Sequence, residues 1–223
     1  MNKFNYILFF LLMFFLESCR RDTADNDLEK NTQHLSLSNT HEVLPVEEFV
    51  KWVGDKENGL SKIKEISEMN YHLSYMPKEC LAYMELKNDN LTKSKFDETL
   101  AHYEGMTYFN LRIELKGGQG ELLKYNLSSP QQYNERINYM AFEMQKDIFL
   151  VQGNDTLMPG MFHFERIYEV APFATVMLAF DNKKFNPESE FTVVYNDRLF
   201  NKGYIKYNYK QKQLIDLPNL SGV

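Results

Sequence analysis

Residues 108–115 read Tyr-Phe-Asn-Leu-Arg-Ile-Glu-Leu, and this stretch decides the fold class. Its apolar residues at 109, 111, 113 and 115 alternate with Tyr, Asn, Arg and Glu. Because successive side chains of a β-strand point to opposite faces, the alternation predicts a strand with one buried and one polar face. Such a strand is typical of an antiparallel sheet that is packed on one side. We therefore expect an antiparallel sheet at the centre of the fold.

Further strand candidates lie on both sides of this stretch. Partial alternation predicts strands over 62–66 and 69–76. After Gly117-Gly118-Gln119-Gly120, residues 121–126 are expected to return as the second strand of a hairpin. From residue 148 onward the strand candidates, each bounded by Asn, Asp, Gly or Pro, are 148–151, 161–170, 174–180, 191–195, 204–209 and 214–217. The C-terminal half is therefore predicted to be sandwich-like.

Short helices are predicted mainly in the N-terminal half. Apolar residues repeat at helical spacing over 46–53, and a longer apolar stripe runs from Tyr133 to Met144. The residues that open or cap the four expected helices are Pro45, Pro77, Ser94 and Ser129. The predicted fold class is α+β, with a predominantly antiparallel sheet and three to four short helices.

The composition is ordinary for a globular protein, except that aromatic residues reach 14% and favour strands. The formal net charge is -6 and no basic cluster is present, so nucleic acid is not expected as a partner. No internal repeat and no Pro-rich or Gly/Ser-rich linker interrupts the sequence after Val43. Residues 43–223 are therefore predicted to form a single α+β domain.

The first residues have the pattern of a secretory leader. An unbroken apolar run from Tyr6 to Leu16 follows a short polar start that includes Lys3. As a helix this run would rise only about 16 Å, roughly half the thickness of the hydrocarbon layer of a membrane. It is too short to span a membrane, and we predict that residues 1–18 are a signal peptide.

The apolar run ends in Leu16-Glu17-Ser18-Cys19, which resembles the lipobox of bacterial lipoproteins, in a Bacteroidetes-like variant. Glu17 departs from the usual small or aliphatic residue at its position. The resemblance implies cleavage before Cys19 and acylation of that cysteine with fatty acids such as palmitate. It also implies a place in the bacterial cell envelope, and we favour the periplasmic side of the outer membrane.

Residues 19–42 are mostly polar and are predicted to be a flexible tether, because they contain too little apolar surface to offset the entropy of ordering. A random coil of this length typically spans about 25–30 Å. The membrane would then be one partner of the protein, held through the lipid on Cys19.

Few residues suggest chemistry. His72, His102 and His163 form no i, i+4 pair with a glutamate, and lipid on Cys19 would leave Cys80 as a lone thiol. We therefore expect no metal site and no cofactor. Two further pairs of candidates concern modification and contact. Thr23 and Thr156 lie in Asp-Thr-aliphatic tripeptides that resemble O-glycosylation sites of exported Bacteroidetes proteins, and Trp52 and Tyr204 are candidate exposed aromatic contacts.

These observations favour a membrane-tethered, non-catalytic binding or assembly component of the cell envelope, whose partner is an envelope protein or a glycan. The alternative is an envelope hydrolase that acts on glycan, peptide or lipid. Its catalytic groups, carboxylates or one of the three histidines, would come together only on folding. The alternative predicts two convergent acids, or a histidine–acid pair with perturbed pKa values.

Overall fold

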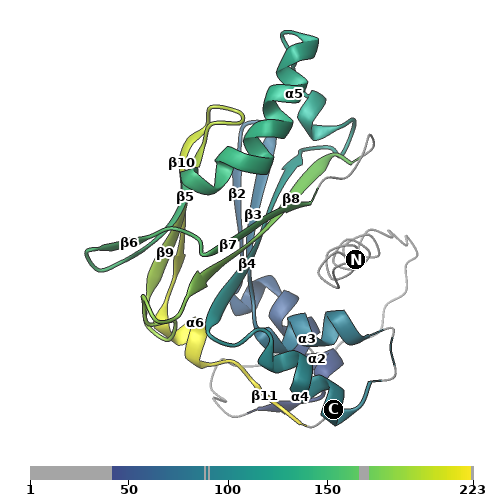
Figure 1. Ribbon diagram of the computed structural model, residues 1–223, viewed down its shortest axis with the longest axis vertical. Helices are drawn as coiled ribbons and strands as arrows, with labels where there is room; N and C mark the ends of the chain where they lie inside the picture. The colour runs from purple at the N-terminus through teal and green to yellow at the C-terminus, as the bar shows by residue number, and fades with distance from the viewer. Residues whose placement is uncertain (1–41, 88, 90, 166–170, 222–223) are drawn as a thin grey trace, which may run out of the picture.

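The computed structural model describes residues 42–87, 89, 91–165 and 171–221. Two antiparallel sheets face each other in this part of the chain (Figure 1). The five-stranded sheet has the order β2-β3-β4-β8-β7, and the four-stranded sheet has the order β10-β9-β5-β6. The predicted α+β class with a mainly antiparallel sheet is confirmed. The sandwich is not confined to the C-terminal half, however, because β2, β3 and β4 form most of one of its layers.

The strands of the five-stranded sheet are β2 (Ser61–Ile66), β3 (Met69–Met76), β4 (Met106–Leu115), β7 (Met161–Glu165) and β8 (Phe173–Asp181). Those of the four-stranded sheet are β5 (Ile148–Gln152), β6 (Asp155–Leu157), β9 (Phe191–Asp197) and β10 (Gly203–Tyr209). The short strands β1 (Val43–Leu44) and β11 (Asn219–Leu220) pair in parallel as a separate small sheet. Of the predicted strand over 161–170, residues 166–170 lie outside the described residues.

Helices cover both ends of the sandwich (Figure 1). At one end lie α2 (Val46–Gly54), α3 (Lys78–Leu86) and α4 (Lys93–Ala101). At the opposite end α5 (Pro130–Asn138) continues into a π-helical turn (Tyr139–Glu143) and a 3-10 turn (Met144–Asp147). A further short helix, α6 (Gln211–Ile215), brings the described part of the chain to five α-helices, more than the three to four expected.

Three local predictions are wrong. The segment after Gly120 does not form a hairpin but a 3-10 helix over Leu122–Lys124, and β4 pairs with β3 and β8 instead. The successive residues Leu122 and Leu123 are both buried, which an alternating strand with one solvent face would not allow.

The second error concerns residues 214–217, which are not a strand. Residues Gln211–Ile215 form α6 and bury Leu214 while Ile215 stays exposed. The third error is the cap of α4. Thr92, not Ser94, caps this helix, and its Oγ1 accepts a hydrogen bond from the amide N–H of Lys95 at 3.4 Å. An oxygen acceptor at this position satisfies one of the N–H groups that a helix leaves open at its start.

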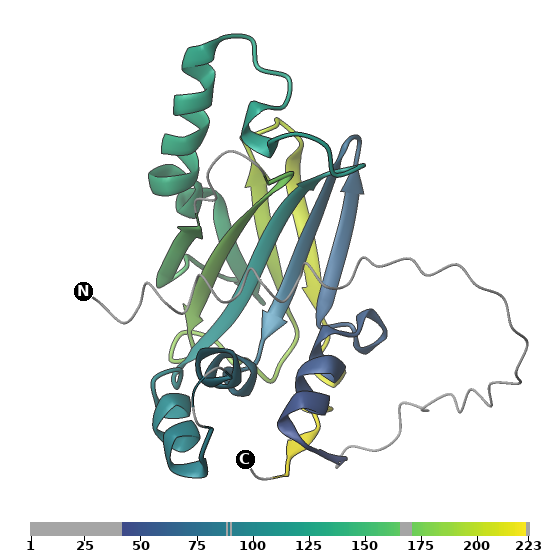
Figure 2. The ribbon, with the colours of Figure 1, turned by 90° about the vertical axis from the view of Figure 1, so that its right-hand side faces the viewer.

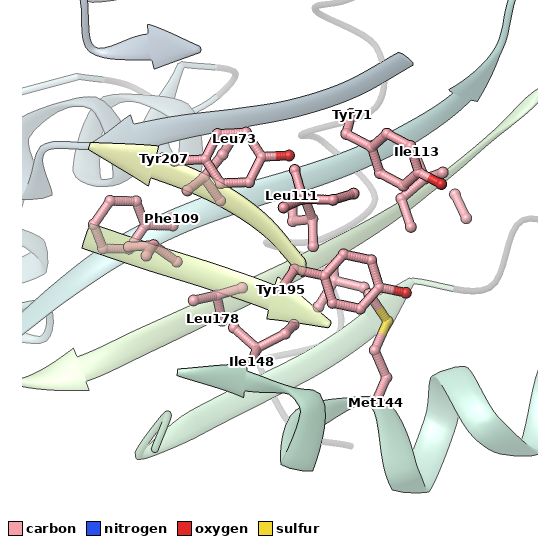
Figure 3. Close-up of a cluster of buried hydrophobic side chains, with 14 of the residues drawn as sticks. Tyr71, Leu73, Phe109, Leu111, Ile113, Met144, Ile148, Leu178, Tyr195 and Tyr207 are labelled. Atoms are coloured by element: carbon pink, nitrogen blue, oxygen red, sulfur yellow. The ribbon is translucent and has the colours of Figure 1, made fainter. Parts of the chain in front are cut away.

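Aromatic and aliphatic side chains from the inner faces of both sheets fill the space between them. Figure 3 shows Tyr71 and Phe109 of the five-stranded sheet lying opposite Tyr195 and Tyr207 of the four-stranded sheet. The ring of Phe109 lies 5.9 Å from that of Phe191 and 5.5 Å from that of Tyr209, measured between ring centroids. Large buried rings of this kind supply much of the hydrophobic stabilisation of a core.

A buried carboxylate joins the two sheets. Asp197, which is only 2% exposed, accepts hydrogen bonds from the Tyr71 hydroxyl at 2.7 Å and the Tyr195 hydroxyl at 3.0 Å. It also accepts hydrogen bonds from the backbone N–H groups of Phe200 at 3.1 Å and Lys202 at 3.3 Å. These two hydrogen bonds stabilise the turn between β9 and β10. Because Tyr71 lies on β3 and Asp197 on β9, this network is a polar link across the core.

Candidate binding face

The side of the five-stranded sheet that points away from the core carries an unusual concentration of polar side chains. Figure 2 views the molecule from this side, with the four-stranded sheet behind. The strand register aligns His72, Arg112, Thr175 and Glu165 in one row across β3, β4, β8 and β7. The neighbouring rows add Asn70 and Glu114 on one side, and Asn110 and His163 on the other. We call these eight residues the polar face.

The alternation of the strands explains why these side chains meet. On β4 the residues 109, 111, 113 and 115 point into the core, so Asn110, Arg112 and Glu114 must point outward. The same period places Asn70 and His72 of β3 on the outer side. Further along the strands, helices α3 and α4 cover this side of the sheet through Met76, Tyr108, Met177 and Ala179. The polar face is the part that these helices leave uncovered.

Charged groups at the centre of the polar face are held in place by one another. In the guanidinium of Arg112, Nη2 lies 3.2 Å from Oε1 of Glu114. The Cζ atom of the same group lies 3.7 Å from the centre of the Phe173 ring. The Nε2 of His72 lies 3.7 Å from the other carboxylate oxygen of Glu114. Packing on the Phe173 ring and pairing with Glu114 both restrict the position of the planar guanidinium.

Several polar atoms of this face have no hydrogen-bond partner among the described residues, although each is buried at the atomic level: Asn70 Oδ1, His72 Nε2, Asn110 Nδ2 and Glu165 Oε2. Asn110 as a whole is only 5% exposed. A buried donor or acceptor without a partner costs about 1–3 kcal/mol, and such groups are rare in folded proteins. Each of these four atoms has less than 1 Å² of accessible surface, so in these side-chain positions a ligand would contact the exposed parts of the face rather than these atoms.

The pKa values of the face are shifted by burial. Burial raises the pKa of the Glu165 carboxyl to about 7, because it disfavours the charged form. Burial lowers the pKa of His72, and the nearby carboxylate of Glu114 opposes this shift only in part. Burial also lowers the pKa of His163. At neutral pH the face thus holds two uncharged imidazoles and the Arg112–Glu114 ion pair, beside a carboxyl whose charged form burial disfavours.

A second concave surface lies at the helical end of the molecule. A groove of about 420 Å³ runs between α2, α4 and residues 217–220. Phe49, Phe96 and Leu220 form part of its apolar wall, and Lys93 and Asp97 stand at its polar side. Lys93 Nζ lies 2.7 Å from Asp97 Oδ2, so these two charges neutralise each other. The carboxylate of Glu79 on α3 also lines the groove.

The residues singled out from the sequence are dispersed. Cys19 and Thr23 lie outside the described residues, and Thr156 is exposed on the edge strand β6. Tyr204 on β10 is 66% exposed, whereas Trp52 is half-buried and packs against the cluster around Phe49.

The histidines and the thiol do not form a common site. His72 and His163 both belong to the polar face, while His102 follows the last residue of α4. Cys80 is 1% exposed in an apolar cluster, and burial raises the pKa of its thiol. The thiol is therefore protonated at neutral pH and packs as a small apolar group.

The polar face was only partly visible in the sequence. The alternation over 108–115 indicated an outward position for Asn110, Arg112 and Glu114, but nothing in the sequence assigned β3, β7 and β8 to the same side. Glu165 in particular becomes part of the site only because β7 pairs with the far edge of β8.

No protein-family model matches the chain, and no curated protein and no solved structure matches it either. Within the described ranges, no three His, Cys, Asp or Glu side chains lie together in a way that could hold a metal ion. In the same part of the chain, no helix has the length and hydrophobicity needed to cross a membrane.

Proposed function

We propose that the protein is a lipid-anchored lipoprotein of the bacterial cell envelope that acts as a non-catalytic binding component, and that its polar face receives the partner. The lipobox-like tetrad ending in Cys19 and the polar residues 19–42 support the anchor and tether. The observation that carries the binding role is the group of polar side chains on interior strands that α3 and α4 leave uncovered, among which His72, Arg112 and Glu114 are partly exposed.

The position of the polar face favours recognition by side chains. It lies mainly on β3, β4 and β8, which are interior strands whose backbone groups are already used in the sheet. Because the backbone of these strands is already paired, little backbone conformational entropy is lost when a partner binds.

The tether can be tested with Cys19→Ala. We expect the wild-type protein in the detergent-soluble membrane fraction and the variant in the aqueous fraction. A variant that remains with the membrane would contradict lipidation at Cys19. Protease treatment of intact and permeabilised cells tests the proposed periplasmic side, because a periplasmic protein is cleaved only after permeabilisation.

The binding role can be tested by capture from solubilised envelope, with a His72→Ala variant as the probe of the polar face, because the His72 side chain is partly exposed. The wild-type protein is expected to retain an envelope protein or a glycan that the variant loses. Asn208→Ala is a matched control, since Asn208 is exposed on β10 of the other sheet. Equal recovery by all three proteins would argue against the polar face as the binding site.

A second candidate function, envelope hydrolase, is favoured by one observation. His72 and Glu114 form a histidine–acid pair with a lowered histidine pKa, and Ser74 lies two positions later on the same side of β3. Against it, the hydroxyl of Ser74 shares a 2.8 Å hydrogen bond with that of Ser61 and is therefore engaged with β2 rather than with His72. Hydrolysis of envelope glycan, peptide or ester substrates that is lost in Ser74→Ala and kept in His102→Ala would support the hydrolase.

A further inference from the structure

Three lysines that are far apart in the sequence meet at one edge of the sandwich, and we call them the lysine cluster. Lys62 and Lys64 lie on β2, the edge strand of the five-stranded sheet, and Lys210 directly follows β10, the edge strand of the other sheet. Lys62 is paired with Leu73 and Lys64 with Tyr71, and both of these partners point into the core. Directly opposite residues of an antiparallel pair lie on the same side of the sheet. Both lysines of β2 therefore point toward the four-stranded sheet.

Gln213 of α6 holds the lysine cluster together. Its Oε1 accepts a hydrogen bond from Nζ of Lys62 at 3.2 Å and another from the backbone N–H of Lys210 at 3.1 Å. Nζ of Lys62 also lies 4.6 Å from the centre of the Tyr209 ring. The Tyr209 hydroxyl in turn donates a hydrogen bond to the carbonyl of Leu60, just before β2. These contacts bring the two edge strands together at the lysine cluster.

No carboxylate accompanies these positive charges. Among the residues that the structure describes, none of the three lysines forms an ion pair. Glu65 is next to Lys64 on β2, but it points to the opposite side of the strand and pairs with Lys116 at 3.1 Å. Asp216 at the end of α6 lies 3.8 Å from Lys212. The lysine cluster is thus a local excess of positive charge on a protein whose net charge is -6.

This excess favours an anionic ligand. Burial lowers the pKa of Lys62, and the ammonium groups of Lys64 and Lys210 lower it further. An anion between the three groups would replace their mutual repulsion by attraction. Lys64 and Lys210 are exposed, so such a ligand can reach them from solvent. Each ammonium group carries three donors, and a phosphate group offers several acceptor oxygens for strong, charge-assisted hydrogen bonds.

The lysine cluster lies toward the end of the molecule at which the predicted tether joins the body. Helix α6 follows Lys210 and leads into β11, which pairs with β1 (Figure 1). The carbonyl of Glu42, the last residue of the predicted tether, accepts a hydrogen bond from the N–H of Asn219 on β11 at 2.8 Å. A lipid anchor on Cys19 would therefore draw this end of the body toward the membrane.

We propose that the lysine cluster binds the phosphate groups of anionic phospholipids, so that the anchored protein rests on the membrane with this end. The inference rests on the proposed lipid anchor and not on the polar face. One lysine near an anionic membrane surface strengthens binding only about fivefold. The anchor makes three such lysines sufficient, because it keeps them at a high effective concentration of lipid.

The test compares the full lipoprotein in vesicles of phosphatidylcholine with the same protein in vesicles of phosphatidylcholine and phosphatidylglycerol in equal parts. Mass spectrometry follows the rate at which an amine-reactive reagent acylates each lysine. We expect Lys64 and Lys210 to react about fivefold more slowly in the anionic vesicles, and this protection to vanish at high salt. Lys206 is the control, since it is exposed on the outward side of β10 and should react equally in both.

Variants locate the site. Lys64→Gln is expected to reduce the protection of Lys210, whereas Lys64→Arg keeps the charge and should keep the protection. Lys206→Gln is the matched control and should leave the protection of Lys210 unchanged. Because Lys64 is exposed and has like charges beside it, its replacement by glutamine should not lower Tm, and a thermal scan checks that the variant is folded.

The outcomes separate this inference from the anchor on which it rests. Equal labelling of Lys64 and Lys210 in the two kinds of vesicle would overturn the inference and leave the anchor standing. The same holds if Lys206 is protected as strongly as they are. If inorganic phosphate protects both lysines equally well in phosphatidylcholine vesicles, the site takes free phosphate and lipid binding is refuted. If the protein stays with neither kind of vesicle, both the anchor and the inference fail.

Discussion

Replacing Asp197 by alanine is expected to destabilise the folded state by about 3–5 kcal/mol. The carboxylate is 2% exposed and accepts four hydrogen bonds, from two tyrosine hydroxyls and two backbone N–H groups. A hydrogen bond to a charged group contributes about 1.5–3 kcal/mol. The loss is smaller than the sum of four such contributions, because the four hydrogen bonds depend on one another and because the alanine variant no longer has a buried charge to desolvate. The alanine leaves the Tyr71 hydroxyl without this partner inside the core, whereas the Tyr195 hydroxyl keeps its hydrogen bond with Tyr139.

The assay is urea unfolding followed by circular dichroism, with a thermal scan beside it. For a domain of 150–250 residues, about 3–5 kcal/mol corresponds to a fall in Tm of roughly 6–20 °C. Asp155→Ala is the control, because Asp155 is exposed on β6. Tyr71→Phe, which removes one of the four donors, should cost about 1–3 kcal/mol. A loss below about 1 kcal/mol for Asp197→Ala would refute the view that this network joins the sheets.

Three further results are expected. Glu165→Gln should be about as stable as wild type below pH 4.5 and about 1–3 kcal/mol more stable above pH 7. The reason is that the pKa of Glu165 is raised from 4.5 to about 7, so the wild type loses stability as the pH rises between these values. Parallel curves of unfolding free energy against pH, measured in urea, would contradict this. Cys80 should resist thiol reagents in the native protein and react after unfolding, since it is buried and burial raises the pKa of its thiol; rapid native labelling would contradict the structure. If Thr156 carries a glycan, Thr156→Ala should lower the intact mass by that of the glycan and leave Tm unchanged, since the residue is exposed.

Alternation and capping made much of the fold predictable. The strands β3, β4 and β10 follow from alternation, whereas β8 and β9 follow from apolar runs bounded by turn residues, since β8 is buried on both faces. Ser129 caps α5 as expected, with its Oγ 3.3 Å from the backbone nitrogen of Gln132. The failed hairpin after Gly120 has a different origin. Four residues rich in glycine permit a tight turn but do not specify the structure of the next segment, and the adjacent Leu122 and Leu123 gained more by burying both side chains at the end of the sheet.

The candidate site was harder to predict, because it depends on long-range pairing. Arg112 and Glu114 are two positions apart in one strand, so their shared side follows from local geometry. Glu165 lies on the same face only because β8 pairs with both β4 and β7. This pairing brings together residues that are far apart in the sequence. The pKa shift of Glu165 is likewise a property of burial and leaves no mark on the sequence around it.

The parallel pair of β1 and β11 has a consequence for the order in which the protein is made. Asn219 donates a hydrogen bond to the carbonyl of Glu42 at 2.8 Å, and Ser221 donates one to the carbonyl of Leu44 at 2.9 Å. Strand β1 is synthesised before all the other described strands, and β11 after them. The two hydrogen bonds between β1 and β11 can therefore form only after all the other described strands have left the ribosome. The first described strand to be made thus pairs with the last.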